Sequence, residues 1–72
     1  MDEKVFYKLL GKRIKYLREN KHYTQEKLAD KSGLSLDYIW KTEVNINNSG
    51  LKALIKISDA LDVNMKDLFN ID

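Results

Sequence analysis

The chain has 72 residues, with 13 Lys or Arg, 11 Asp or Glu, one histidine, no cysteine and no proline. A chain of this length supports one small hydrophobic core, so residues 1–72 are expected to form a single domain. The lack of cysteine excludes disulfides and cysteine-ligated metals, and one histidine is too few for a zinc site. We therefore expect neither a metal nor another cofactor.

The sequence contains no signal for insertion into a membrane or for export across one. No apolar run approaches the roughly 18 residues of a membrane span. The start, MDEKVFYKLL, lacks the basic-then-apolar order of a signal peptide, so we expect a cytoplasmic protein without membrane contact.

The charged residues are distributed unevenly along the chain. Residues 1–41 carry ten Lys or Arg against six Asp or Glu, and residues 42–72 carry three against five. This asymmetry fits a polyanionic partner on one face, or an ordinary solvated surface.

Five segments repeat apolar residues at steps of three and four, which predicts an all-α fold. The first runs from about Glu3 to Asn20, and its expected inner face consists of Phe6, Leu10, Arg13, Ile14 and Leu17. Gly11 interrupts this segment and costs about 1 kcal/mol relative to alanine inside a helix. It predicts a bend, or the boundary of a short leading turn.

The second segment begins at Thr24, whose hydroxyl can accept a hydrogen bond from a free backbone N–H of the first helical turn. The helix is expected to reach about Lys31. Its buried side chains are expected to be Leu28 and Ala29.

Ser35 is a second N-cap of the same kind, for a third helix that ends near Thr42 or Glu43. Residues 44–48 then form a loop. Asn45 is expected there in the left-handed conformation that commonly ends a helix.

The fourth helix is expected to begin at Asn48 or Ser49. Asn64 predicts the cap of a fifth, short helix, with Asp67 as the acid of a capping box. The side chains expected to be buried in these two helices are Leu51, Leu54, Ile57, Leu61, Leu68 and Phe69.

Residues 32–34 are all that remain to reverse the chain between the second and third helices. So tight a turn needs a residue with positive φ, which Gly33 adopts without steric cost. The helices then cross at roughly 90–120°. Ala29 is small enough to let their backbones approach, and Ile39 reaches back beneath them, with Leu28 and Leu34 closing the core. This spacing is that of a helix-turn-helix, although any helical hairpin with a glycine turn shares it.

Longer stretches carry a more specific signal, and they cover about 60 of the 72 residues in order: LGKRIKYLREN (10–20), TQEKLADKSGLS (24–35), the Ile and Glu of YIWKTE (38–43), and GLKALIKISDALDVNMKDLF (50–69). With them the chain resembles the phage-repressor and Cro-like (Xre-type) helix-turn-helix family. The resemblance implies a compact five-helix, lambda-repressor-like domain that binds specific double-stranded DNA sequences. It also implies a homodimer on a two-fold symmetric operator.

The resemblance further implies roles for individual residues. Arg18 on the first helix is expected to pair with Glu43 at the end of the recognition helix, as a structural clamp. Gln25 is expected to lie against the phosphate backbone, where it can also brace the third helix; the alternative is an ordinary exposed helix start. Two departures weaken the expected DNA contacts: residues 44–49 contain neither the basic residues nor the proline of many relatives, and Thr42 replaces a larger aliphatic.

A recognition helix offers its first turn and outward face to base edges in the major groove. Lys41 can donate to guanine or phosphate, and Leu36 can pack on a thymine methyl. Asp37 can accept from cytosine, or simply complement the helix dipole. Trp40 can pack against the fourth helix, donate to a phosphate or form part of an interface. The residues expected at the base edges are Ser35, which also caps the helix, Leu36, Asp37, Tyr38, Lys41 and, beside them, Trp40.

Phosphate contacts supply most of the affinity of such proteins, largely through Lys and Arg. Lys27 is the main candidate outside the recognition helix. Backbone N–H groups at Thr24, Asn47 and Asn48 are expected to add to it. Other basic residues near the groove are Lys21 and Lys31, with Lys12 and Lys15 further along the first helix.

The C-terminal helix is the expected dimer interface, through Met65, Leu68, Phe69 and Ile71; the alternative is that Leu68 and Phe69 close the monomer's own core. The function predicted is a DNA-binding transcriptional regulator of the repressor or restriction–modification controller type. The rival is a protein-interaction module, such as the antitoxin of a toxin–antitoxin pair. An enzyme is not expected, because no nucleophile–base pair, phosphate-binding glycine loop or small-molecule site is evident.

Overall fold

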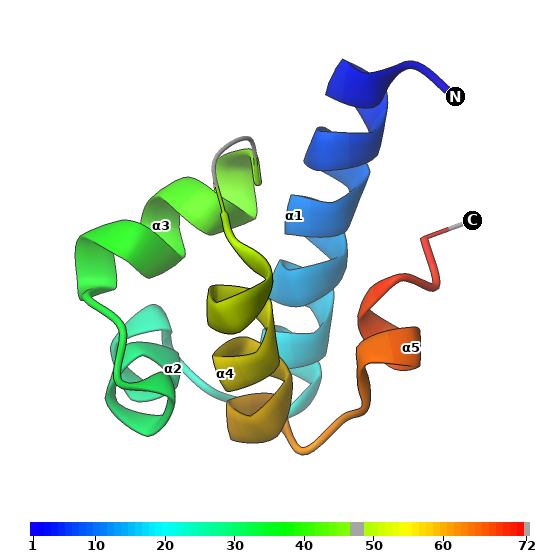
Figure 1. Ribbon diagram of the computed structural model, residues 1–72. Coiled ribbons are helices and arrows are strands. Elements are labelled where there is room, and N and C mark those ends of the chain that lie inside the picture. The colour runs from blue at the N-terminus through cyan, green and yellow to red at the C-terminus, as the bar shows by residue number, and fades with distance from the viewer. Residues whose placement is uncertain (47–48, 72) are drawn as a thin grey trace.

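A computed structural model describes residues 1–46 and 49–71, and every regular element in these ranges is a helix. The predicted all-α fold of five helices is therefore confirmed (Figure 1). The elements are α1 (Glu3–Asn20), α2 (Gln25–Ser32), α3 (Leu36–Val44), α4 (Leu51–Leu61) and α5 (Met65–Leu68). In the described part of the chain, no helix has both the length and the hydropathy to cross a membrane.

The core lies between α1 and the shorter helices, which pack on it and on one another (Figure 1). The expected inner face of α1 is confirmed at Leu10, Ile14 and Leu17. Each fully buried Leu or Ile contributes about 1.5–3 kcal/mol relative to an exposed position. The remaining buried apolar side chains are Leu28, Ala29, Ile39, Ile46, Leu54, Ile57, Leu61 and Leu68.

Two positions that were predicted to be buried are exposed, and one loop residue is buried. Leu51 and Phe69 were expected in the core but are exposed. Ile46 lies in the loop predicted for it, and there its side chain is buried and its N–H donates to the carbonyl of Tyr7 on α1 at 3.4 Å. The loop after α3 therefore contributes to the core through a contact that is remote in sequence.

Gly11 marks a close approach between helices, and the predicted boundary of a short leading turn is wrong because α1 runs through it without interruption. A Cβ added at Gly11 would lie 2.7 Å from the carbonyl oxygen of Thr42 and 2.8 Å from that of Glu43. Only glycine lets the last turn of α3 rest directly on α1.

Local side-chain hydrogen bonds begin three of the helices as predicted. The hydroxyls of Thr24 and Ser35 accept from backbone N–H groups three residues on, both at 3.0 Å. Asn64 and Asp67 form the reciprocal bonds of a capping box. Because these bonds join residues close in sequence, they are set by the local sequence alone.

Two helix ends were predicted incorrectly. The residue before α4 is Gly50, which has no side-chain cap, so the cap expected at Ser49 is wrong; Asn48 lies outside the described residues. Asn45 is extended, with φ of −165°, rather than left-handed, and α3 continues to Val44. Burial of Ile46 explains this geometry, because an extended Asn45 carries the chain back toward α1.

The turn between α2 and α3 has the predicted geometry. Gly33 has φ of +74° and its N–H donates to the carbonyl of Ala29 at 2.9 Å, which ends α2. Leu28 and Ile39 are fully buried beneath the two helices, and Leu34 packs against the same core. The result is a helix-turn-helix in which α3 lies along the outer edge of the molecule (Figure 1).

Candidate nucleic-acid interface

The helix α3 has one face fixed in the protein and one face open to solvent. Ile39, Thr42 and Glu43 are buried, whereas Leu36, Asp37, Trp40 and Lys41 are exposed; Tyr38 is half-buried. Trp40 keeps more than half of its surface in solvent, which leaves its ring free for a partner. The expected recognition face is therefore available.

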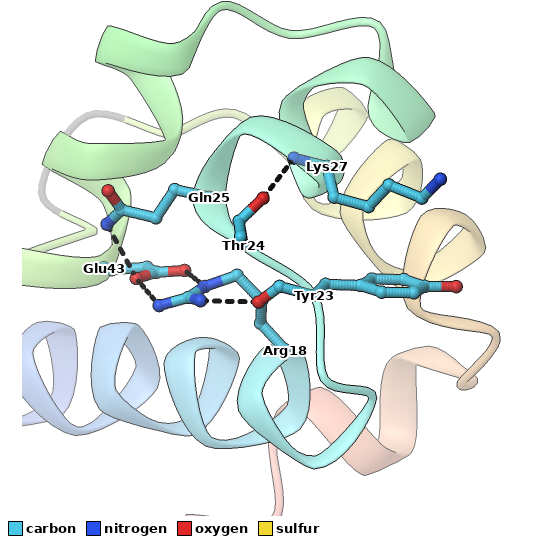
Figure 2. Close-up of polar contacts among 6 residues, drawn as sticks. All are labelled: Arg18, Tyr23, Thr24, Gln25, Lys27 and Glu43. Carbon is cyan, nitrogen blue, oxygen red and sulfur yellow. Dashed lines mark hydrogen bonds and ion pairs between the residues drawn. The ribbon is translucent and has the colours of Figure 1, made fainter.

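A hydrogen-bonded clamp holds the inner end of α3. Arg18 donates to Glu43 through Nε at 2.6 Å and through Nη2 at 3.0 Å, which confirms the expected bidentate pair (Figure 2). Its Nη1 donates to the carbonyl of Tyr23 at 2.8 Å. The hydrogen bond with Glu43 raises the pKa of Arg18, outweighing the opposing effect of its burial.

Gln25 joins the clamp from the first turn of α2. Its Nε2 donates to Oε1 of Glu43 at 3.1 Å, so the expected bracing of α3 is confirmed (Figure 2). The clamp thus connects α1, the start of α2 and the end of α3, and so sets the direction in which α3 projects. The carbonyl of Tyr23 was not anticipated, because backbone acceptors leave no signal in the sequence.

The residues expected to contact phosphate lie at the start of α2. Thr24 and Lys27 are exposed, and the hydroxyl of Thr24 accepts from the backbone N–H of Lys27 (Figure 2). The Lys27 side chain extends away from the clamp (Figure 2). Its ammonium group is therefore separate from the bonds that hold the fold. Asn47 and Asn48, the other residues expected to contact phosphate, lie outside the described residues.

The outward charges of α3 form a pair with each other. Lys41 Nζ lies 3.0 Å from Asp37 Oδ2, one helical turn away, with both side chains exposed. Such surface pairs contribute only about 0–1 kcal/mol, so a phosphate or a base edge can displace either partner. Ser35, the cap of α3, accepts from the N–H of Tyr38, which confirms its capping role and leaves its own O–H free to donate.

Thr42, the unusual residue at the buried side of α3, has a local explanation. Its side chain is buried, and its hydroxyl lies 3.4 Å from the hydroxyl of Ser49. A larger aliphatic could not make this bond. The pair links the end of α3 to the segment just before α4, in a chain that lacks proline there.

The C-terminal helix is less exposed than the dimer prediction assumed. Leu68 is fully buried in the monomer, which confirms for this residue the alternative that it closes the monomer's own core and leaves it no surface for a partner. Phe69 is exposed and stacks on Phe6 of α1 with ring centroids 6.4 Å apart. Met65 and Ile71 are half-buried against the core. Among residues 1–46 and 49–71, no group of three metal-binding side chains comes together.

Comparison with known proteins agrees with this geometry. The family model described as helix-turn-helix matches residues 14–68. The chain is 36% identical over 63 residues to the HTH-type transcriptional regulator SinR of Bacillus licheniformis, a match that spans 86% of this chain but only 57% of that protein. The chain therefore spans little more than half the length of this relative.

Solved structures are similar as well. The restriction–modification controller protein C.AhdI from Aeromonas hydrophila superposes with a TM-score of 0.84 at 35% identity, covering 88% of this chain and 96% of that chain. SinR in complex with DNA, described as the master regulator for biofilm formation, has a TM-score of 0.78 at 35% identity, covering 85% and 98%. The chain thus belongs to the helix-turn-helix family, of the Xre- and Cro-like type.

Proposed function

We propose that this protein is a transcriptional regulator that binds specific DNA sequences through the major groove. The observation that carries the proposal is the two-sided environment of α3: Ile39 and Glu43 fix one face, while Leu36 and Lys41 project from the other. A helix held in this way can enter a groove without rearranging. The similarity to controller proteins and to DNA-bound SinR supports the same reading.

The proposed contacts fall into two groups. The outward face of α3 meets the base edges, and the start of α2 with the loop after α3 meets the phosphates. A regulator of this kind works where the DNA is, which in a bacterium is the cytoplasm. The base-edge group is Ser35, Leu36, Asp37, Tyr38, Trp40 and Lys41, and the phosphate group is Thr24, Gln25, Lys27, Asn47 and Asn48.

Binding is proposed to require a homodimer. One small module makes few contacts, whereas two copies related by a two-fold axis read half-sites about 34–36 Å apart, or a multiple of this distance. The surface proposed for the dimer consists of Phe69, stacked on Phe6, with the half-buried edges of Met65 and Ile71. Phe69 is exposed and Phe6 only partly buried, so this aromatic pair gains from burial between copies.

Selection of bound molecules from a pool of random duplexes tests the regulator proposal. We expect enrichment of a short inverted repeat, with affinity that falls steeply as salt rises because phosphate contacts release counterions. Binding without enrichment and without salt dependence would refute it. That result would favour the protein-interaction module, with the exposed Leu36 and Trp40 meeting a protein such as a toxin.

Sedimentation of two matched variants tests the dimer surface. Phe69→Lys places a charge in the proposed interface, and Ile55→Lys places one at a similarly exposed apolar position on α4. We expect Phe69→Lys to give a monomer that binds the full operator weakly, and Ile55→Lys to remain a dimer. Circular dichroism verifies that both are folded. Dissociation by Ile55→Lys alone would place the interface on α4 instead.

A further inference from the structure

The exposed face of α3 carries an apolar stripe, formed by Leu36, Trp40 and Val44. Their exposed fractions are 46%, 54% and 58%. Because they are four residues apart, they lie one above the other on the same side of the helix. Single exposed apolar side chains are common, but an aligned set marks a surface that meets a partner.

The rest of α3 offers few groups for hydrogen-bonded reading of bases. Its sequence, LDYIWKTEV, contains no Arg, Asn or Gln, and Lys41 is its one residue of a type that forms bidentate bonds with guanine or adenine. The exposed charges are Asp37 and Lys41, whose weak surface pair at 3.0 Å leaves either of them able to turn to a base edge or a phosphate. Glu43 is committed to the clamp. Beyond the polar contacts of Asp37 and Lys41, the interaction that this face can add in a groove is therefore an apolar one.

The apolar feature of the major groove is the C5-methyl group of thymine, which an alkyl or aromatic side chain can cover. We propose that Leu36 and Trp40, the first two residues of the apolar stripe, read thymine methyl groups, so that the preferred half-site carries thymines opposite the first two turns of α3. This inference depends on the DNA-binding function proposed above. DNA is favoured over a protein groove because residues 1–41 carry ten Lys or Arg against six Asp or Glu, a charge that suits phosphates.

The helix geometry limits which residues take part. Four residues advance an α-helix by about 6 Å, close to two base-pair steps of 3.4 Å, so Leu36 and Trp40 reach thymines about two steps apart. Leu36 lies in the first turn of α3 and is expected to make the main methyl contact, because the N-terminal residues of a recognition helix contact base edges. Val44 lies about 12 Å further along than Leu36 and contacts no base.

The test uses the duplex selected in the preceding experiment. Replacing a thymine with deoxyuridine deletes only the methyl group and leaves the base pair and its hydrogen-bonding edge unchanged. At the two thymines that face the stripe, we expect each replacement to weaken binding about fourfold, the value that corresponds to ~0.8 kcal/mol for one buried carbon. Thymines elsewhere in the duplex serve as the control.

Variants assign the effect to the stripe. Leu36→Ala and Trp40→Ala are expected to abolish the response to deoxyuridine at one position each. Lys41→Ala weakens binding but keeps the response. Val44→Ala removes an equally exposed apolar side chain and is expected to change neither affinity nor response.

The outcomes separate this inference from the proposed function. Enrichment of a duplex whose affinity is the same with thymine or deoxyuridine would refute methyl reading and leave the regulator proposal standing. If no duplex is enriched, both fail. If Leu36→Ala and Trp40→Ala leave DNA binding intact, the stripe belongs to a protein partner and the inference is wrong.

Discussion

Replacing Glu43 with alanine removes the acceptor at the centre of the clamp. Glu43 accepts two hydrogen bonds from Arg18 and one from Gln25. The Arg18 and Glu43 side chains are only 9% and 3% exposed. Without Glu43, the guanidinium keeps its bond to the carbonyl of Tyr23 but loses its counter-charge. The variant therefore leaves a buried, uncompensated positive charge.

The expected loss follows from this geometry. Breaking a buried pair by removing one partner costs about 3–5 kcal/mol, and the surviving bond to Tyr23 places this case near ~3 kcal/mol. A domain of this size has a free energy of unfolding of roughly 4–11 kcal/mol. At about 4–8 °C per kcal/mol, the melting temperature should fall by roughly 12–24 °C.

Thermal unfolding followed by circular dichroism measures this loss, and Asp37→Ala is the matched control on the same helix. Asp37 takes part in an exposed ion pair worth about 0–1 kcal/mol. A double-mutant cycle with Arg18→Met should show that the two single losses do not add. The DNA preference of Glu43→Ala, measured below its melting temperature, should be unchanged. Equal losses for Glu43→Ala and Asp37→Ala would refute the clamp.

Five further variants examine backbone geometry and DNA contact. Gly11→Ala should destabilise by about 1–3 kcal/mol despite the better helix propensity of alanine, because its Cβ meets two carbonyl oxygens of α3; a higher melting temperature would disprove the close approach. In denaturant titrations, Gly33→Ala should cost about 1–2 kcal/mol through its φ of +74°, whereas Gly50→Ala, at φ of −80°, should lose only the smaller N-cap preference for glycine over alanine. In salt-titrated binding assays, Lys27→Ala should weaken all duplexes equally and reduce the salt slope by about 1, whereas Lys41→Ala should also relax sequence preference. Identical selectivity for the two lysine variants would contradict this division.

Several features could be read from the sequence because they depend on neighbouring residues. The hydroxyls of Thr24 and Ser35 and the box formed by Asn64 and Asp67 satisfy N–H groups within three residues. Gly33 has to adopt positive φ because the turn between the helices is so short. In each case the physical constraint acts within one turn of the chain, so a local pattern is enough to reveal it.

Other features depended on contacts that are distant in sequence. The apolar period of α4 predicted Leu51 in the core, but this residue begins the helix and remains in solvent. The spacing of apolar residues in α4 also gave no sign that Ser58 is buried, where its hydroxyl donates a hydrogen bond to the carbonyl of Ile55. Periodicity predicts which side of a helix faces inward, but not how far along the helix the neighbouring elements reach.

By itself the sequence determined the five helices, three of their caps, the glycine turn and, through family resemblance, the pairing of Arg18 with Glu43. The tertiary structure decided that α3 packs directly on Gly11, that Ile46 belongs to the core and that Leu68 is too deeply buried to contact a partner. The physical reason is how far apart in the sequence the interacting residues are. Caps and turns satisfy backbone groups within a few residues, whereas burial depends on which distant segments happen to cover a side chain.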